Sequence, residues 1–311
     1  MANLKEIRGR IATVKNTRKI TSAMSRIAAA RLVKAQQAAM AARPYGERLA
    51  EVVRALVSGI GEGDHQGVHP LLARRTGTGR VGLVLITADR GLAGGFNANA
   101  NRAANNFLRK ERGEGREVVI VAVGKKGRSF LGAGKTQVHR FHEAPTLGNF
   151  VQRAKDIAAE AMAMFLPPGE ENPIAAAEGA ALPQVDAVYL VYNFFKSVLT
   201  QEVRTVQLLP MVNPEPAADG SQNAPVPPVF EPDSASLLGH LLPIAVEAQI
   251  QQALINSIAG EIAARRAAMD SATDNASALI RELTLHYNRE RQAAITKELL
   301  EIIGGAEALK G

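Results

Sequence analysis

The stretch IAVEAQIQQALINSIAGEIAARRAAMDSATDNASALIREL, residues 244–283, has the pattern of a helix that needs a partner helix. Twelve positions alternate four and three residues apart, and ten are apolar: Ile244, Ala248, Gln251, Ile255, Ile258, Ile262, Arg265, Met269, Ala272, Ala276, Leu279 and Leu283. This heptad spacing is typical of a coiled coil. Because no proline occurs from Ile244 to Ile303, the sequence predicts one helix of roughly 90 Å at about 1.5 Å per residue.

The first 43 residues supply a candidate partner helix. An apolar spacing of three and four residues starts at Leu4, Ile7, Ile11 and Val14, and resumes after a slip at Met24, Ala28, Leu32, Ala35, Ala39 and Ala42. Residues 1–43 carry ten Lys or Arg and one acid, whereas residues 233–311 carry ten acids and seven bases. We therefore expect an antiparallel coiled coil of the two terminal helices. The seam of the longer helix stops at Leu283, so its final 20 or so residues should extend unpaired.

The middle of the chain alternates strand-like and helix-like segments. Candidate strands are 80–86, 118–123, 187–192 and 202–209, with a weaker one at 136–141, and candidate helices are 97–112, 125–131 and 147–165. This alternation is typical of an α/β domain with a mainly parallel sheet. The predicted division is a helix at 1–58, a linker at 59–79, the α/β domain at 80–212, a loop at 213–232, and a helix at 233–311. Pro243 should bend or interrupt this last helix.

The loop TADRGLAGGFN, residues 87–97, tests whether the α/β domain binds a nucleotide. A P-loop needs a lysine and a hydroxyl after its second glycine, and this loop has neither. The dinucleotide spacing of glycines also fails at Gly91, Gly94 and Gly95. We interpret the loop as a tight turn in which Asn97 or Asn99 caps the following helix.

Other chemistry has little support in the sequence. The chain has no cysteine, its six histidines form no metal-ligand array, and no stretch of about 18 uncharged apolar residues predicts a membrane span. We expect no catalytic residue, no cofactor and no metal. The basic N-terminal arm leaves a coiled-coil adaptor or a nucleic-acid-binding protein as the alternative, although the arm has no aromatic residue for base stacking before Tyr45.

Three motifs carry a family resemblance across the whole chain: LKEIRGRIATVKNTRKITSAM at 4–24, TADRGLAGGFN at 87–97 and AMDSATDNASALIRELTLHYNRERQAAITKELLEIIGGAEAL at 268–309. Together they resemble the gamma subunit of rotary F-type ATP synthases. The resemblance implies a central rotor shaft that couples ion-driven rotation of a c-ring to conformational cycling of catalytic beta subunits. It also implies a coiled coil inside an alpha–beta hexamer, and a Rossmann-like domain near the epsilon subunit and the c-ring. The location implied is peripheral, at the cytoplasmic face of a bacterial inner membrane.

Ala93 stands where the family motif commonly has cysteine, and the dithiol insertion of the chloroplast type is absent. Thiol switching is therefore not expected in this chain.

The resemblance also implies which residues contact the hexamer. Met24, within the KITSAM motif, should meet acidic loops of the beta subunits, although a seam methionine is the alternative. Arg291, Gln292 and Thr296 should form polar contacts near the end of the shaft, with Arg265 and Arg266 as a second candidate pair. Exposed apolar side chains are an aggregation hazard, so we expect Leu299, Leu300, Ile302 and Ile303 to sit in an apolar collar of the hexamer. The alternatives are a solvated helix face and a frayed tip.

Overall fold

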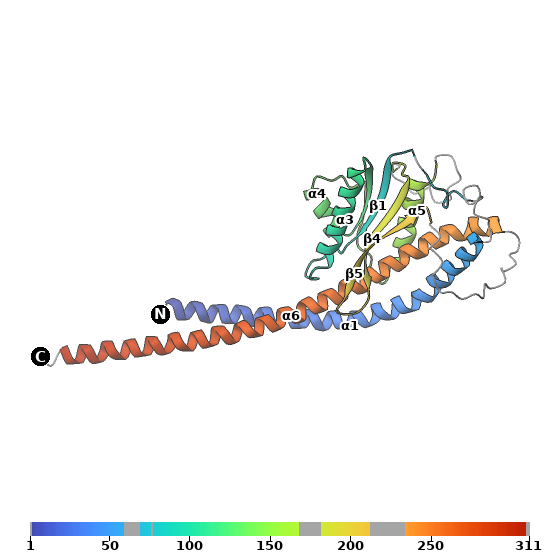
Figure 1. Ribbon diagram of the computed structural model, residues 1–311. Helices are drawn as coiled ribbons and strands as arrows, with labels where there is room; N and C mark the ends of the chain where they lie inside the picture. The colour runs from blue at the N-terminus through green and yellow to red at the C-terminus, as the bar shows by residue number, and fades with distance from the viewer. Residues whose placement is uncertain (1, 59–68, 76, 168–181, 212–233, 309–311) are drawn as a thin grey trace, which may run out of the picture. The chain divides into compact units, whose positions relative to one another are not determined.

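The computed structural model describes residues 2–58, 69–75, 77–167, 182–211 and 234–308 (Figure 1). The chain divides into two compact units, Met1–Ala30 with Arg265–Gly311, and Arg31–Ala264. We call these the paired-helix unit and the sheet unit, and describe each by itself. The predicted loop 213–232 and most of the predicted linker 59–79 lie outside the described residues.

The two terminal helices are α1, Ala2–Ser58, and α6, Ser234–Ala308, and both run through the two units. Pro44 lies inside α1 and Pro243 inside α6. An interruption of α6 at Pro243 is therefore wrong. Proline removes one hydrogen bond of the helix, but Leu242 and Val246 beside it are fully buried, and packing of this kind supplies most helical stability in proteins.

The sheet unit contains a five-stranded sheet of order β3-β2-β1-β4-β5. Its strands are β1 (Arg80–Ile86), β2 (Glu117–Val123), β3 (Arg140–His142), β4 (Ala187–Phe195) and β5 (Gln201–Leu209). β1 pairs in parallel with β2 and β4, β2 pairs in parallel with β3, and β5 is antiparallel to β4. The fold is therefore the α/β class that the sequence predicts, with a mostly parallel sheet.

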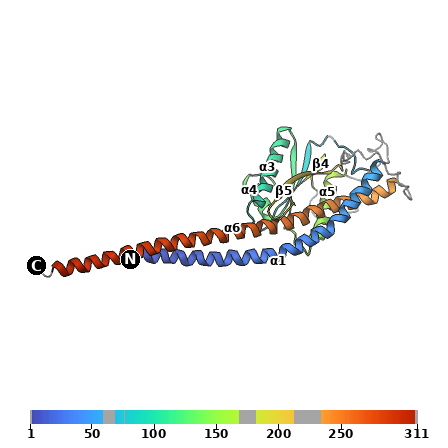
Figure 2. The same ribbon diagram turned by 60° about the horizontal axis from the view of Figure 1, so that its bottom comes forward.

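Helices cover both faces of this sheet (Figures 1 and 2). Side chains alternate along each strand, so Leu83 and Leu85 face α3 (Phe96–Gly113) and α4 (Lys125–Ala133), while Val84 and Ile86 face α5 (Phe150–Phe165). The second face also packs against buried residues of α1 and α6 from the sheet unit, such as Leu56 and Leu254. Both faces being covered explains why the parallel strands read as nearly continuous apolar runs.

Candidate partner-binding surface

Two polar contacts fix how α1 and α6 face each other in the paired-helix unit. The hydroxyls of Thr21 and Thr273 lie 2.7 Å apart, and the Ser25 hydroxyl donates a hydrogen bond to the Asp270 carboxylate. The partner numbers fall on α6 as they rise on α1, so the helices are antiparallel, as predicted.

The seam of α1 contains polar residues where the sequence predicts a slip. Thr21 and Ser25 are buried, so the heptad register runs from Val14 through them to Ala28, although Arg18, which also falls in this register, is exposed. The predicted slip is wrong because the sequence pattern counted only apolar residues. A serine or threonine can occupy a buried seam position when its hydroxyl has a partner across the seam.

The seam of α6 beyond Met269 also differs from the predicted one. The predicted positions Ala276 and Leu283 are retained, but Thr273 and Ile280 are partly buried, whereas Leu279 is 42% exposed. The partly buried positions continue past Leu283 at Tyr287, Glu290 and Ala294, so the predicted end of the seam is also wrong. The predicted seam and the observed seam both keep the heptad spacing, so the spacing alone cannot distinguish them. The Thr21–Thr273 contact shows which side of α6 faces α1.

The end of α6 extends past α1. Ala2 lies 19 residues before Thr21 and so faces position 292, which lies 19 residues after Thr273. α6 continues for 16 residues beyond this position, to Ala308. Every residue from Ile295 to Gly305 is exposed. An unpaired end close to the expected 20 residues is therefore present.

The candidate contact residues all lie in the paired-helix unit. Leu299, Leu300, Ile302 and Ile303 are 54–68% exposed. The polar candidates near them, Arg291, Gln292 and Thr296, are exposed as well. Arg265 and Arg266 are half-buried, and Arg266 Nε lies 3.8 Å from Asp270 Oδ2. These side chains are available to a partner to different degrees, and the unpaired end is the most accessible.

Met24 is half-buried beside the seam. Its neighbours on the same helix face, Ile20 and Ile27, are 60% and 55% exposed, and the sequence analysis missed both. On α6 it also missed Leu285, which is 72% exposed. These three residues could have been recognised as exposed apolar side chains in the sequence, because each is an isoleucine or leucine on a predicted helix but outside the predicted seam. Met24 therefore lies half-buried between two exposed isoleucines, and we call these three residues the strip Ile20–Met24–Ile27.

The turn 87–97 packs against its own chain. Ala93 and Phe96 are buried with Ala264 of α6, and the Phe96 ring lies 3.4 Å from where a side chain at Gly260 would begin. Neither predicted cap forms, because the residue before α3 is Gly95 and no side chain bonds the helix end. Asn97 Oδ1 instead accepts from the Ala88 N–H at 2.9 Å, which closes the turn.

The nearby N-terminus of α4 already holds a carboxylate. Asp89 Oδ1 accepts from the Lys125 N–H at 2.8 Å and from the Ala144 N–H at 3.2 Å. Gly124 precedes the helix with φ 95°, and a Cβ there would lie 2.2 Å from the Thr87 carbonyl oxygen. A helix N-terminus of this kind is where many α/β proteins bind phosphate. Here the chain's own aspartate takes that position.

His139 and His142, at the two ends of the stretch HRFH (residues 139–142), hold β3 in place. His139 Nδ1 accepts from the Ile120 N–H at 3.1 Å, and burial lowers the pKa of His139. His142 lies between Glu160, at 2.8 Å from Nε2, and Arg153, at 3.0 Å from Nδ1. Both imidazoles therefore have structural partners. Among the described residues, no three His, Asp or Glu side chains are placed to hold a metal ion.

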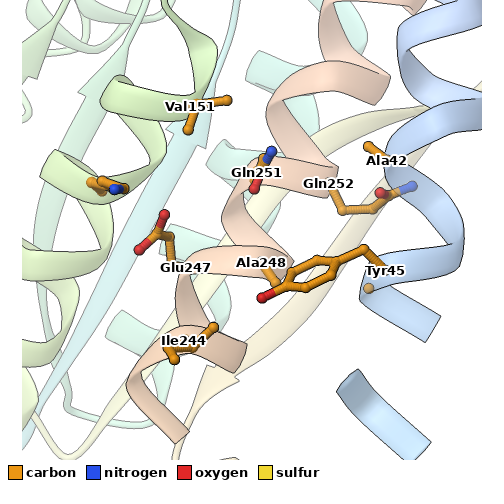
Figure 3. Close-up of a pocket in the computed structure, with 10 residues that line it drawn as sticks. Ala42, Tyr45, Val151, Ile244, Glu247, Ala248, Gln251 and Gln252 are labelled. Carbon is orange, nitrogen blue, oxygen red and sulfur yellow. The ribbon is translucent and has the colours of Figure 1, made fainter. Parts of the chain in front are cut away.

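A hollow of about 320 Å³ lies among α1, α5 and α6 in the sheet unit (Figure 3). Tyr45 reaches toward Ala248 from α1, and Glu247, Gln251 and Gln252 come from α6. Its lining combines charged, polar and apolar side chains. In the described part of the chain, no helix is long and apolar enough to cross a membrane.

The antiparallel terminal helices, with an α/β domain between them in the sequence, define the class of coiled-coil proteins that carry an inserted α/β domain. Residues 3–309 match the family model described as ATP synthase. The chain is 43% identical over 311 residues to the ATP synthase gamma chain of Geobacter sp. (strain M21), and 40% identical over 310 residues to that of Anaeromyxobacter dehalogenans (strain 2CP-1 / ATCC BAA-258). Both matches cover the whole of both chains. This chain belongs to the ATP synthase gamma-chain family.

Solved structures agree in fold. A chain of the Euglena gracilis mitochondrial ATP synthase, in a structure of OSCP, F1 and c-ring, matches with a TM-score of 0.60 at 18% identity, over 99% of this chain and 95% of that one. A chain of the Tetrahymena thermophila mitochondrial ATP synthase central stalk and c-ring matches with a TM-score of 0.54 at 21% identity, over 81% and 99%.

Proposed function

We propose that this chain is the central rotor shaft of an F-type ATP synthase, which couples ion-driven rotation of a c-ring to conformational cycling of the catalytic beta subunits. The observation that carries the proposal is the exposed, unpaired end of α6 in a gamma-chain family member. A shaft acts by contacts that differ between beta conformations, because a contact that is equal in every state shifts no equilibrium.

The unpaired end acts as the bearing in this proposal. Leu299, Leu300, Ile302 and Ile303 would turn inside an apolar collar of the alpha and beta subunits. Apolar contact is non-directional, so it tolerates rotation, whereas specific salt bridges would hold the shaft at one angle. Gly304 and Gly305 mark the part of the tip that contributes least.

Further down the shaft, the contacts become directional. The strip Ile20–Met24–Ile27 would meet the beta subunits through Met24. Arg291, Gln292 and Thr296 would form polar contacts with hexamer loops, and Arg265 and Arg266 a second set. Charge-assisted hydrogen bonds of this kind are stronger and more orientation-dependent than apolar contact.

The remaining partners are the epsilon subunit and the c-ring, so the chain associates with a membrane only through them. We place it at the cytoplasmic face of a bacterial inner membrane, without a catalytic site or cofactor of its own. The nucleic-acid-binding or adaptor alternative gains no support from the family match or from the described contacts.

Assembly tests the proposal. The full chain should co-purify with an alpha–beta hexamer, and the complete synthase, with its c-ring in inverted membrane vesicles, should pump protons with ATP. Removing residues 304–311 should leave assembly and rotation nearly unchanged, whereas removing 298–311 should weaken assembly and leave rotation partly intact. A 298–311 deletion that assembles as stably as the full chain would exclude the bearing role.

Met24 gives a second test. Met24→Lys adds a cation that can pair with acidic beta loops, so the ratio of protons pumped to ATP hydrolysed should fall in complexes that still assemble. The matched control is Ala23→Lys, which adds the same charge to the neighbouring exposed position. Equal pumping by wild type and Met24→Lys complexes would remove Met24 from the contact set.

A further inference from the structure

The sheet unit contains a groove of about 530 Å³ between α1, β4, β5 and α6. It differs from the hollow of Figure 3 in volume and in lining. Apolar side chains line most of it, including Leu49, Val53, Leu72, Leu190, Val206 and Met211. Small-molecule sites are concave, mostly apolar and of about 300–1,000 Å³, with a few placed polar groups. The groove has this size and composition.

Arg204 is the positively charged group on the sheet side of the groove, beside the polar side chains of Tyr192 and Gln207. The guanidinium carbon of Arg204 lies 3.6 Å from the centre of the Phe194 ring. Burial raises the pKa of Tyr192, so its hydroxyl remains a neutral donor. Arg204 also pairs with Glu202 at 3.3 Å, and both of these side chains are about half exposed. A guanidinium has five N–H donors, and an exposed pair is weak, so Arg204 can accept a further anion.

The α1 side of the groove adds two more cations, Arg43 and Arg54. Glu47 is the one carboxylate among the groove residues, and it pairs with Arg43 at 2.7 Å in an exposed i,i+4 contact. Three arginines stand against two carboxylates, Glu47 and the Glu202 that pairs with Arg204, and this excess of positive charge favours a negatively charged ligand. The hollow of Figure 3 has no such excess of positive charge, because its lining contains one cation, Lys155, and one carboxylate, Glu247.

We propose that this groove binds a free medium-chain fatty acid, with its carboxylate on Arg204 and its alkyl chain along Leu190, Val206 and Val53. The charge excess on the rim selects the carboxylate, and the apolar lining takes the chain. The bound molecule would touch α1, the sheet and α6 together, and so would stabilise the sheet unit. This site is independent of the proposed shaft role, because none of its residues belongs to the paired-helix unit.

Calorimetric titration of the full chain with dodecanoate, below its micelle concentration, tests the proposal. We expect saturable binding of one molecule per chain and a rise in Tm. Arg204→Gln should weaken binding roughly tenfold, the loss expected for one hydrogen bond to a charged group. Arg128→Gln is the matched control, because Arg128 stacks on Phe141 in a similar way outside the groove, and it should bind as wild type does.

Two further arms separate the head group from the chain. Dodecanol has the same alkyl chain without the charge and should bind at least about tenfold more weakly than dodecanoate. Gly46→Leu places a side chain in open space at the groove and should reduce the affinity for both molecules. The proposal is overturned if Arg204→Gln binds dodecanoate within twofold of wild type, if dodecanol binds equally well, or if many molecules bind per chain.

Discussion

The two ends of α6 have similar apolar residues in opposite surroundings. In the sheet unit, Leu238, Leu242 and Leu254 are fully buried against the sheet and α5. In the paired-helix unit, Leu299, Leu300 and Ile302 are more than half exposed. An apolar residue on a helix therefore indicates that something covers it, but not whether the cover is its own chain or a partner. Stability measurements on the isolated chain separate the two cases.

The largest difference should come from truncating a leucine at each end of α6. Leu254→Ala removes a fully buried side chain and should lower the free energy of unfolding by about 2–5 kcal/mol. Leu300→Ala, at a position 64% exposed, should change it by less than about 0.5 kcal/mol. Urea unfolding of the isolated chain measures both. A similar loss at Leu300 would mean that the chain covers its own tip.

Substitution of the helix glycines should give a smaller difference. At Gly260 a Cβ would lie 3.4 Å from Phe96 and 3.5 Å from Gln201, which is ordinary contact, so Gly260→Ala should be tolerated. The larger side chain in Gly260→Val should clash with Phe96 and cost about 1–3 kcal/mol. Gly304→Val, where the added side chain meets open space, should lose no packing. Thermal unfolding gives the order, and a harmless Gly260→Val would contradict the close approach.

The polar seam should contribute less again. Thr273→Val keeps the shape of the side chain but removes its hydrogen bond to Thr21, so we expect a loss of about 1 kcal/mol. The control is Thr284→Val, because Thr284 bonds only its own helix, at the Ile280 carbonyl, and is exposed. Urea unfolding should show a lower free energy of unfolding for Thr273→Val and no change for Thr284→Val. Equal losses would place Thr273 outside the seam.

The smallest effect should be a pH dependence from His139. Burial lowers the pKa of His139 from its ordinary value of 6.5, so the unfolded chain takes up the proton more readily than the folded chain. The stability contributed by the neutral imidazole is complete above pH 6.5 and falls as the pH drops through the folded pKa. His139→Asn, which can still accept from Ile120, should flatten this part of the profile. An unchanged profile would contradict the assignment.

The sheet could be predicted because local sequence decides it. The strands β1, β2 and β4 are apolar runs covered on both faces, and their predicted bounds lie within three residues of those found. The edge strand β3 was the weakest prediction, and only three residues form it. Pairing on one side and two histidine contacts hold it, and neither leaves a periodic pattern in the sequence.

The seam and the turn could not be predicted, for a common reason. Thr21 and Ser25 look like surface residues until Thr273 and Asp270 are brought opposite them. Asn97 looks like a helix cap until the chain folds back to place Ala88 N–H beside it. The partners of Thr21 and Ser25 lie on the other terminal helix, and the partner of Asn97 lies at the opposite end of the turn. The sequence pattern does not show these partners, and without them a buried polar residue cannot be told from an exposed one. The candidate contact residues could be located on α6, but their binding partners stay proposals.

Asp89 gives the α/β domain a permanent occupant at the N-terminus of α4. The Asp89 carboxylate is covalently attached through the loop after β1, so it competes with free anions for these N–H groups. Its effective concentration is set by the length of this connection, is about millimolar for short flexible tethers, and does not change with the concentration of nucleotides in the cell. A free phosphate group would therefore have to displace the Asp89 carboxylate before it could bind the Lys125 N–H.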